Sequence, residues 1–182
     1  MLSIALGGVC AGISLSPGSS CQLIAASPER KQEVIESLLG QVKGCVVGAD
    51  GGLISNLPVG ENITLPAQYH GVGSDASRAS RLTELTRQFG ADGAALRNLD
   101  HAHPAQLSPL QRRLAGFMRA MLMEPELMVF DSLLEGISRS NASKLREFKR
   151  IFHLYFPFRH VMFVNFADDP LLQGLVEHTY HV

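Results

Sequence analysis

The sequence predicts an α/β fold in which helices cover both faces of a mostly parallel β-sheet. Short apolar runs alternate along the chain with segments of helical periodicity. Residues 107 to 131, LSPLQRRLAGFMRAMLMEPELMVFD, are typical of a capped amphipathic helix that leads into a buried strand ending on a carboxylate. Strands that alternate with helices form parallel sheets, because each helical connection crosses over the sheet. Both observations therefore indicate the same architecture.

The expected elements follow in chain order from these patterns. The strands are short apolar runs, and the helices carry apolar residues three and four positions apart. In the helix after Ser108, for example, Leu110, Leu114 and Phe117 belong to one apolar stripe. We expect strands at Cys21 to Ala25, Cys45 to Val47, Leu127 to Phe130 and Val161 to Asn165, and helices at Glu29 to Leu39, Leu110 to Met123 and Ser143 to Tyr155.

Between the second and third strands lies a long stretch of helical character. From about Pro66 to Gln106 no segment has a strand pattern, and Leu82, Leu85 and Phe89 share one helix face before Gly90 ends the helix. We therefore expect a helical subdomain at about residues 66 to 123, inserted in the α/β core. No linker, repeat or low-complexity tract divides the chain, so residues 1 to 182 are expected to form a single domain.

Composition excludes several classes of function. With 182 residues and 46% hydrophobic residues, the chain can bury a sizeable core. Its 16 basic and 17 acidic residues give a net charge of -1, which argues against a nucleic-acid partner and against broad binding to anionic lipid. We expect partners to be recognised through local features instead.

The cysteines and the first residues bear on the compartment. Cys10, Cys21 and Cys45 are odd in number and widely spaced, so we interpret them as reduced core thiols of a cytoplasmic protein. The N-terminal segment is apolar but has no basic start, and it is interrupted well short of the roughly 20 residues that span a bilayer. We expect no direct membrane insertion.

The first strand-to-helix turn, LIAASPERKQEV, is where a phosphate-binding loop would lie. Such a loop needs Gly-x-x-x-x-Gly-Lys-Ser/Thr, because the glycines let backbone N–H groups surround the phosphates and the hydroxyl holds magnesium. In this register the four positions are occupied by Ala25, Arg30, Lys31 and Gln32. Only Lys31 matches.

The residues inside this turn favour a helix that caps itself. Ser27 is a good N-cap, Pro28 suits the first helical position, and Glu29 is an acid in the first turn. Pro28 offers no N–H, and Glu29 and Glu33 place negative charge where a polyphosphate needs positive potential. Weak anion binding by Arg30 and Lys31 is the alternative.

A second self-capped helix start occurs at residues 108 to 111. Ser108 and Gln111 have the spacing of a capping box, in which each side chain accepts from the backbone N–H of the other residue. Pro109 removes one further donor from this helix end. An ordinary well-capped helix is the simplest interpretation.

Asp131 ends a buried strand and is the candidate magnesium ligand. One carboxylate holds magnesium poorly without a phosphate to share the ion. Ser132 has no basicity suited to activating a nucleophile, and Glu135 is expected to lie outside the site. The pairs His101 with His103 and His178 with His181 lack further ligands for a metal site.

The order of these features resembles an ATP-binding-cassette (ABC) nucleotide-binding subunit over almost the whole chain. Residues 107 to 131 resemble the family's signature-to-Walker-B segment, and residues 50 to 71, DGGLISNLPVGENITLPAQYHG, resemble the segment after its Q-loop. The second match most resembles the cassettes of MCE-type lipid and organic-solvent-tolerance transporters. The resemblance implies a P-loop NTPase-like cassette fold.

Site roles carry over at few positions. Lys31 matches the phosphate lysine, Asp131 the magnesium aspartate, and Leu107, Ser108 and Gln111 three of the five signature residues. Ser132 stands at the position of the catalytic Glu, so no catalytic residue is expected. Further departures are Ala49 at the Q-loop Gln, Gly136-Ile137-Ser138 at the D-loop, and Phe166 or Ala167 near the switch His.

The resemblance implies a catalytically degenerate subunit that supports or regulates a membrane transporter. ATP hydrolysis is expected to be lost, and ATP with magnesium is expected to bind weakly at most, through Lys31, Arg30, Ser108, Gln111 and Asp131. The implied partners are an integral membrane permease, docked at Asn56 to Gly71, and a second cassette subunit. The location is then cytoplasmic and peripheral to the inner membrane. Two alternatives stay open: an active ATPase with displaced catalytic groups, and a free-standing adaptor.

Overall fold

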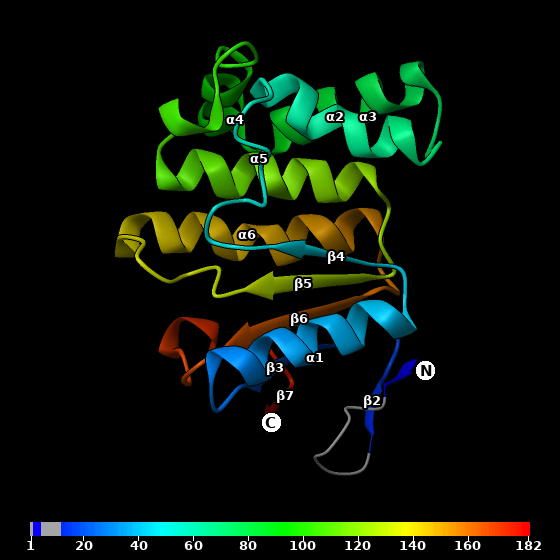
Figure 1. Cartoon of the computed structure of the whole chain (residues 1–182), viewed down its shortest axis with the longest axis vertical. Coiled ribbons are helices and arrows are strands. Elements are labelled where there is room, and N and C mark those ends of the chain that lie inside the picture. The colour runs from blue at the N-terminus through cyan, green and yellow to red at the C-terminus, as the bar shows by residue number, and fades with distance from the viewer. Residues whose placement is uncertain (1, 5–11) are drawn as a thin grey trace. The chain divides into compact units, whose positions relative to one another are not determined.

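The computed structural model describes residues 2–4 and 12–182, so Cys10 lies outside the described residues. The chain divides into two compact units (Figure 1). The first comprises residues 1–46 and 125–182 and is called the sheet unit. The second, residues 47–124, is called the helical unit. Each is described by itself.

A five-stranded sheet forms the centre of the sheet unit, in the order β4-β5-β6-β3-β7. β6 pairs in parallel with both β5 and β3, and β3 pairs in parallel with β7. This confirms the predicted mostly parallel sheet. The strands are β3 (Ser20–Ile24), β4 (Gly44–Val47), β5 (Leu127–Asp131), β6 (His160–Asn165) and β7 (His178–His181).

Two helices cover the faces of this sheet. Helix α1 (Pro28–Gln41) buries Val34, Ile35 and Leu38 in one cluster with alternate residues of β3, β5 and β6. Helix α6 (Arg139–Tyr155) packs on the other side, where the Phe148 ring lies 6.2 Å from that of Phe130. Alternation along each strand therefore supplies both apolar layers, as it does in parallel sheets.

A short antiparallel hairpin precedes the sheet. It consists of β1 (Leu2–Ile4) and β2 (Ile13–Leu15), and Ile4, Ile13 and Leu15 are buried in the same cluster as helix α1. The sequence pattern gave no strand here, because each strand is three residues long. Burial in the same cluster as α1 explains why these three residues are apolar.

The helical unit contains α2 (Val59–Tyr69), α3 (Asp75–Gln88), α4 (Gly90–Arg97), the 3₁₀ turn η1 (Pro104–Gln106) and α5 (Pro109–Leu122). Gly90 has a φ of 54° and separates α3 from α4, in agreement with the expected helix end. The helices begin earlier than expected, at Val59, so that Pro66 lies inside α2. The buried Asn62 side chain explains this start, since it bonds Ile54, Leu57 and Pro58 and holds the preceding loop on the helix.

Two further boundaries differ from the sequence expectation. The final strand β7 was not predicted, because most of its residues are exposed and it lacks an apolar run. Helix α6 begins at Arg139, four residues before Ser143, since Ser138 caps it by accepting from the Asn141 N–H. Within residues 2–4 and 12–182, none of the helices has the length and apolar character to cross a bilayer.

Candidate functional site

The sheet unit brings together three of the residues singled out from the sequence. Lys31 lies in the first turns of α1, Asp131 ends β5, and Ser132 follows it. The Lys31 Nζ lies 2.7 Å from the Asp131 Oδ1 and donates to the Ser132 Oγ at 3.1 Å. Both charged side chains are largely buried, with 17% of Lys31 and 27% of Asp131 exposed. The two residues that the sequence analysis matched to a phosphate ligand and a magnesium ligand are therefore bound to each other.

An aromatic ring lies against the lysine of this ion pair. Phe166, directly after β6, places its ring centroid 4.3 Å from the Lys31 Nζ, within the range of a cation–π contact. In the described part of the chain, the buried Asp131 Oδ1 has no polar partner other than the Lys31 ammonium. The sequence resemblance expects a switch His near Phe166, and the Phe166 ring carries no group that could transfer a proton. We call Lys31, Asp131, Ser132 and Phe166 the Lys31 cluster.

The backbone of the first turn donates its N–H groups within the protein. The Ala25 N–H donates to the Asn165 carbonyl at 2.8 Å, and the Ala26 N–H donates to the Val182 carbonyl at 3.1 Å. Ser27 is the N-cap and accepts from the Arg30 N–H at 3.2 Å, while Pro28 has no N–H. The donors that a phosphate loop aims at its ligand are thus already used. The predicted self-capping of this helix is confirmed.

Charge near the helix start is also arranged without an anion. The pKa of Glu29 is lowered by its backbone N–H and by a hydrogen bond from Ser27, so this exposed acid stays ionised at the positive end of α1. Arg30 forms an ion pair with Glu33 at 3.0 Å on the helix surface. The carboxylates of Glu29 and Glu33 therefore supply the negative charge that a bound anion would bring.

A cavity of about 280 Å³ opens beside the Lys31 cluster. Its wall includes Ser132, Phe166, Asp168 and Asp169, and three of its lining residues are acidic. Glu135, expected from the sequence to lie outside the site, is the third of these acids, because the turn after β5 folds it back beside Ser132. A polyanion would meet repulsion here.

The other two predicted site residues belong to the helical unit. Ser108 caps α5: its Oγ accepts from the Gln111 N–H at 3.3 Å, and the Gln111 side chain accepts from the Ser108 N–H at 2.8 Å. Pro109 occupies the first helical position. The predicted capping box is confirmed, and each side chain satisfies the backbone N–H of the other residue.

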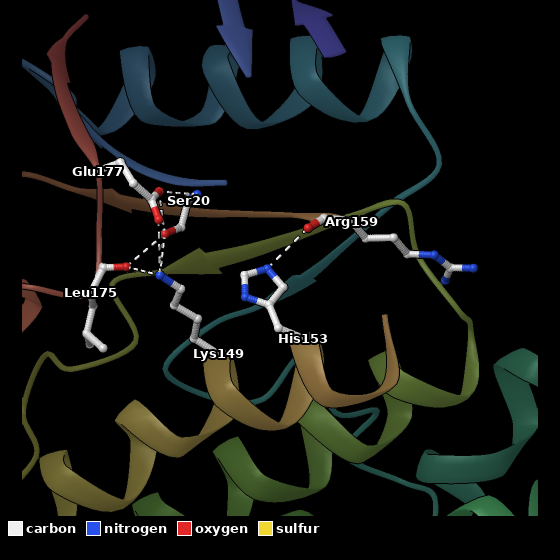
Figure 2. A network of polar contacts seen from close by, with 6 residues as sticks. All are labelled: Ser20, Lys149, His153, Arg159, Leu175 and Glu177. Atoms are coloured by element: carbon white, nitrogen blue, oxygen red, sulfur yellow. Dashed lines mark hydrogen bonds and ion pairs between the residues drawn. The ribbon is translucent and has the colours of Figure 1, made fainter. Parts of the chain in front are cut away.

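Sequence reasoning missed a second polar cluster, formed by Ser20, Lys149, Leu175 and Glu177 (Figure 2). Lys149 of α6 donates to the Ser20 Oγ and to the Leu175 carbonyl, and its Nζ lies 3.7 Å from the Glu177 Oε1. Glu177 also accepts from the backbone and hydroxyl of Ser20. We call these four residues the Lys149 cluster. It ties α6 to the start of β3 and to the segment before β7.

This second cluster perturbs its neighbours. Partial burial alone would raise the pKa of Glu177, but hydrogen bonds from Ser20 and the Lys149 charge lower it overall. Burial, and then the charge of Glu177, raise the pKa of the Cys21 thiol to about 12. Burial and the Lys149 charge lower the pKa of His153, whose Nε2 lies 3.1 Å from the Arg159 carbonyl (Figure 2).

No set of three metal-binding side chains comes together in residues 2–4 and 12–182. His178 and His181 lie at opposite ends of the edge strand β7. His101 and His103 are exposed residues of the helical unit.

Comparisons with known proteins place the fold. No family model matches the chain. Solved structures with the same fold include cbiO1 from Clostridium perfringens, part of the ABC transporter complex cbiONQ, with a TM-score of 0.70 and 10% identity over 94% of this chain and 76% of that one. A metal-chelate type ABC transporter in an inward-facing conformation gives a TM-score of 0.73 and 15% identity over 94% and 71%. The predicted ABC-cassette, P-loop NTPase-like fold is thereby confirmed.

Part of the chain is also similar in sequence to curated import proteins. An Fe(3+) ions import ATP-binding protein of Mesorhizobium japonicum is 33% identical over 103 residues, which are 56% of this chain and 26% of that protein. A methionine import ATP-binding protein of Rhodococcus jostii is 32% identical over 101 residues, or 53% and 28%. The matches thus span little more than a quarter of the length of these relatives.

Proposed function

We propose that this chain, an ABC-cassette fold similar in sequence to ATP-binding subunits of import systems, is a catalytically degenerate subunit that supports or regulates a membrane transporter. On this proposal it lies in the cytoplasm, peripheral to the inner membrane, and acts through contacts with a permease and a second cassette. ATP hydrolysis is lost.

The Lys31 cluster is the observation that carries this proposal. A triphosphate needs the lysine and several backbone N–H groups, and its magnesium needs the aspartate. In this chain the Lys31 ammonium is paired with Asp131 at 2.7 Å, and the turn's donors bond Asn165, Val182 and Ser27. Binding nucleotide would break these contacts first. The residues present therefore do not fit magnesium and ATP, and no hydrolytic step is assigned to them.

The experiment is to titrate the purified full chain with ATP and magnesium by calorimetry and to assay phosphate release. We expect no measurable turnover and little or no heat of binding. The matched variant is Asp131→Asn, which removes the charge of the candidate magnesium ligand. Appreciable turnover that disappears in Asp131→Asn would contradict the proposal.

A permease contact is supported by exposed apolar side chains in the helical unit. Ile54, Leu65 and Tyr69 are 44%, 42% and 83% exposed and lie within or beside the segment that resembles the family's post-Q-loop region. Large exposed apolar side chains grouped along one segment are typical of protein interfaces. Purification from a membrane extract should recover an integral membrane protein, and Leu65→Ser with Tyr69→Ser should abolish that recovery. A soluble monomer without partner would favour the free-standing adaptor.

The finer proposal of MCE-type lipid transport rests on the resemblance of residues 50 to 71. The two relatives named above are import proteins for Fe(3+) and methionine, so they lend it no support. Identification of the co-purified permease tests this part separately.

A second candidate function, an active ATPase with displaced catalytic groups, is favoured by one observation. Glu135 lines the cavity next to Ser132 and is the one glutamate of that wall. If it replaced the missing base, Glu135→Gln would abolish turnover and leave nucleotide affinity unchanged. We expect no ATP turnover in the wild type, and therefore no change in turnover in this variant.

A further inference from the structure

The outer flank of α6 carries a second cavity, of about 600 Å³, wholly within the sheet unit. Its volume is in the range of small-molecule sites. Residues 143, 146, 150 and 153 are three or four positions apart and therefore share one helix face. We call it the α6 pocket, lined by Ser143, Arg146, Glu147, Lys149, Arg150, His153 and Leu175.

The α6 pocket concentrates positive charge in a chain that is slightly acidic overall. Arg146, Lys149 and Arg150 oppose one lining carboxylate, Glu147, and Glu177 pairs with Lys149 from outside the lining, so the formal charge is +1 with His153 neutral. The whole chain carries -1. A concave wall of one sign attracts ligands of the other sign.

The cations of this pocket are not equally engaged. Arg150 is paired with Glu147 at 2.5 Å, and Lys149 is held by Ser20, Leu175 and Glu177. Arg146 has no hydrogen bond or ion pair with any residue that the structure describes. Its guanidinium presents several donors in a planar arrangement that suits two oxygens of a phosphate. The pocket thus offers one uncommitted cation beside one fixed cation.

Apolar surface completes the wall. Leu175 belongs to the lining, and so do Arg146 and Lys149, whose side chains carry apolar methylene stems. The Lys149 ammonium is positioned before any ligand arrives, because it already bonds the Leu175 carbonyl of the same wall (Figure 2). A ligand with an anionic head and a small apolar body matches this lining.

We propose that the α6 pocket binds a small organic phosphate monoester, with Arg146 as its principal contact. The site is separate from the Lys31 cluster and does not depend on the transporter proposal. His153 provides a signal of occupancy. Burial and Lys149 lower its pKa in the free protein. The other titratable groups around it are Arg146, Glu147, Arg150, Glu177 and His160. An anion beside the ring stabilises the charged form.

The test uses the full chain and phenyl phosphate, followed by calorimetry and by NMR titration of the His153 ring, which is assigned from the signal missing in His153→Gln. We expect a single site and a rise in the pKa of His153 on binding. Arg146→Gln should weaken binding at least about tenfold, whereas Arg139→Gln, in the first turn of the same helix and outside the pocket, should leave it unchanged.

Further arms distinguish the sources of a phosphate group. Inorganic phosphate should bind more weakly than phenyl phosphate, since it cannot use the Leu175 wall. Vesicles of phosphatidylcholine with phosphatidic acid should not retain the chain. Absence of any His153 response at saturating phenyl phosphate, equal weakening by Arg146→Gln and Arg139→Gln, or binding to the vesicles alone would each overturn the proposal. None of these outcomes bears on ATP turnover, so the two proposals fail separately.

Discussion

The Lys31 cluster and the Lys149 cluster use the same chemistry at opposite ends of one sheet. Each joins a lysine to a serine hydroxyl and a carboxylate, but the first lies where β5 ends and the second where β3 begins. The carboxyl ends of parallel strands are where α/β proteins bind ligands. At that end this chain has a closed ion pair, and at the other end the same groups hold elements together. This similarity predicts that the Lys31 cluster stabilises the fold as well.

The largest effect is expected from Lys149→Met. The variant leaves Ser20, Glu177 and the Leu175 carbonyl without their shared donor in a partly buried site. Loss of a charged hydrogen-bond partner should lower the free energy of unfolding by about 2 kcal/mol. Urea denaturation followed by circular dichroism measures it. Lys43→Met, at an exposed position, is the control. If Lys149→Met lowered the free energy of unfolding no more than the control does, the cluster would not stabilise the fold.

Lys31→Met is expected to cost less, about 1 kcal/mol, because Asp131 keeps partial access to water. The same urea experiment measures it. The double variant Lys31→Met with Asp131→Asn should recover part of the loss, since no unpaired charge then remains. If Lys31→Met were instead neutral and ATP bound tightly to the wild type, the lysine would be a ligand-binding group and the comparison would fail.

A smaller effect concerns pH. The pKa of Glu177 is lowered in the folded state, so its contribution is present above the unfolded value near 4.5 and is lost as pH falls through the lower folded value. The midpoint of urea unfolding should therefore differ less between pH 6 and pH 3 in Glu177→Gln than in the wild type. Glu84, whose pKa is lowered to about 2 chiefly by its hydrogen bond from Arg87, contributes to both proteins and cancels in this difference. An unchanged difference would show that Glu177 is not stabilised as an anion.

The smallest expected effect is a difference in reactivity between two thiols, without a change in the stability of the fold. With its pKa raised to about 12, Cys21 stays protonated at pH 8 and is buried, so iodoacetamide should not modify it in the folded protein. The partly exposed Cys45 should react faster. Mass spectrometry of peptides resolves both rates. Equal rates for Cys21 and Cys45 in the native chain would show that the start of β3 opens readily.

The difference between the clusters also explains what the sequence could predict. Asp131 and Ser132 adjoin the end of one apolar run, and Lys31 follows another at the spacing of a phosphate loop. Parallel pairing brings the ends of such runs to one edge of the sheet. The Lys149 cluster leaves no such signal, because Ser20 begins a strand, Lys149 lies within a helix, and no motif joins them in sequence. The interpretation of Ser27 and Ser108 as helix caps succeeded for a different reason. Caps depend on neighbours in sequence.

Elements that depend on tertiary contacts were harder to predict. β7 is an edge strand whose polar residues face solvent, so its alternation carries no apolar signal. α2 contains Pro66, and its start is set by Asn62, which bonds a loop that only the folded unit positions. Glu135 was placed outside the site because three residues separate it from Ser132, but a turn returns it to the cavity wall.

The pairing of β7 with β3 has a consequence for how the protein is made. The Ala26 N–H and one edge of β3 find their partners in residues 178 to 182, which leave the ribosome long after β3 itself. Residues 47–124 form a continuous compact unit and can complete their packing during synthesis. Until β7 is synthesised, β3 has an unpaired edge, and such an edge can pair with the wrong strand. A chain truncated before residue 178 would therefore combine a packed helical unit with an aggregation-prone sheet.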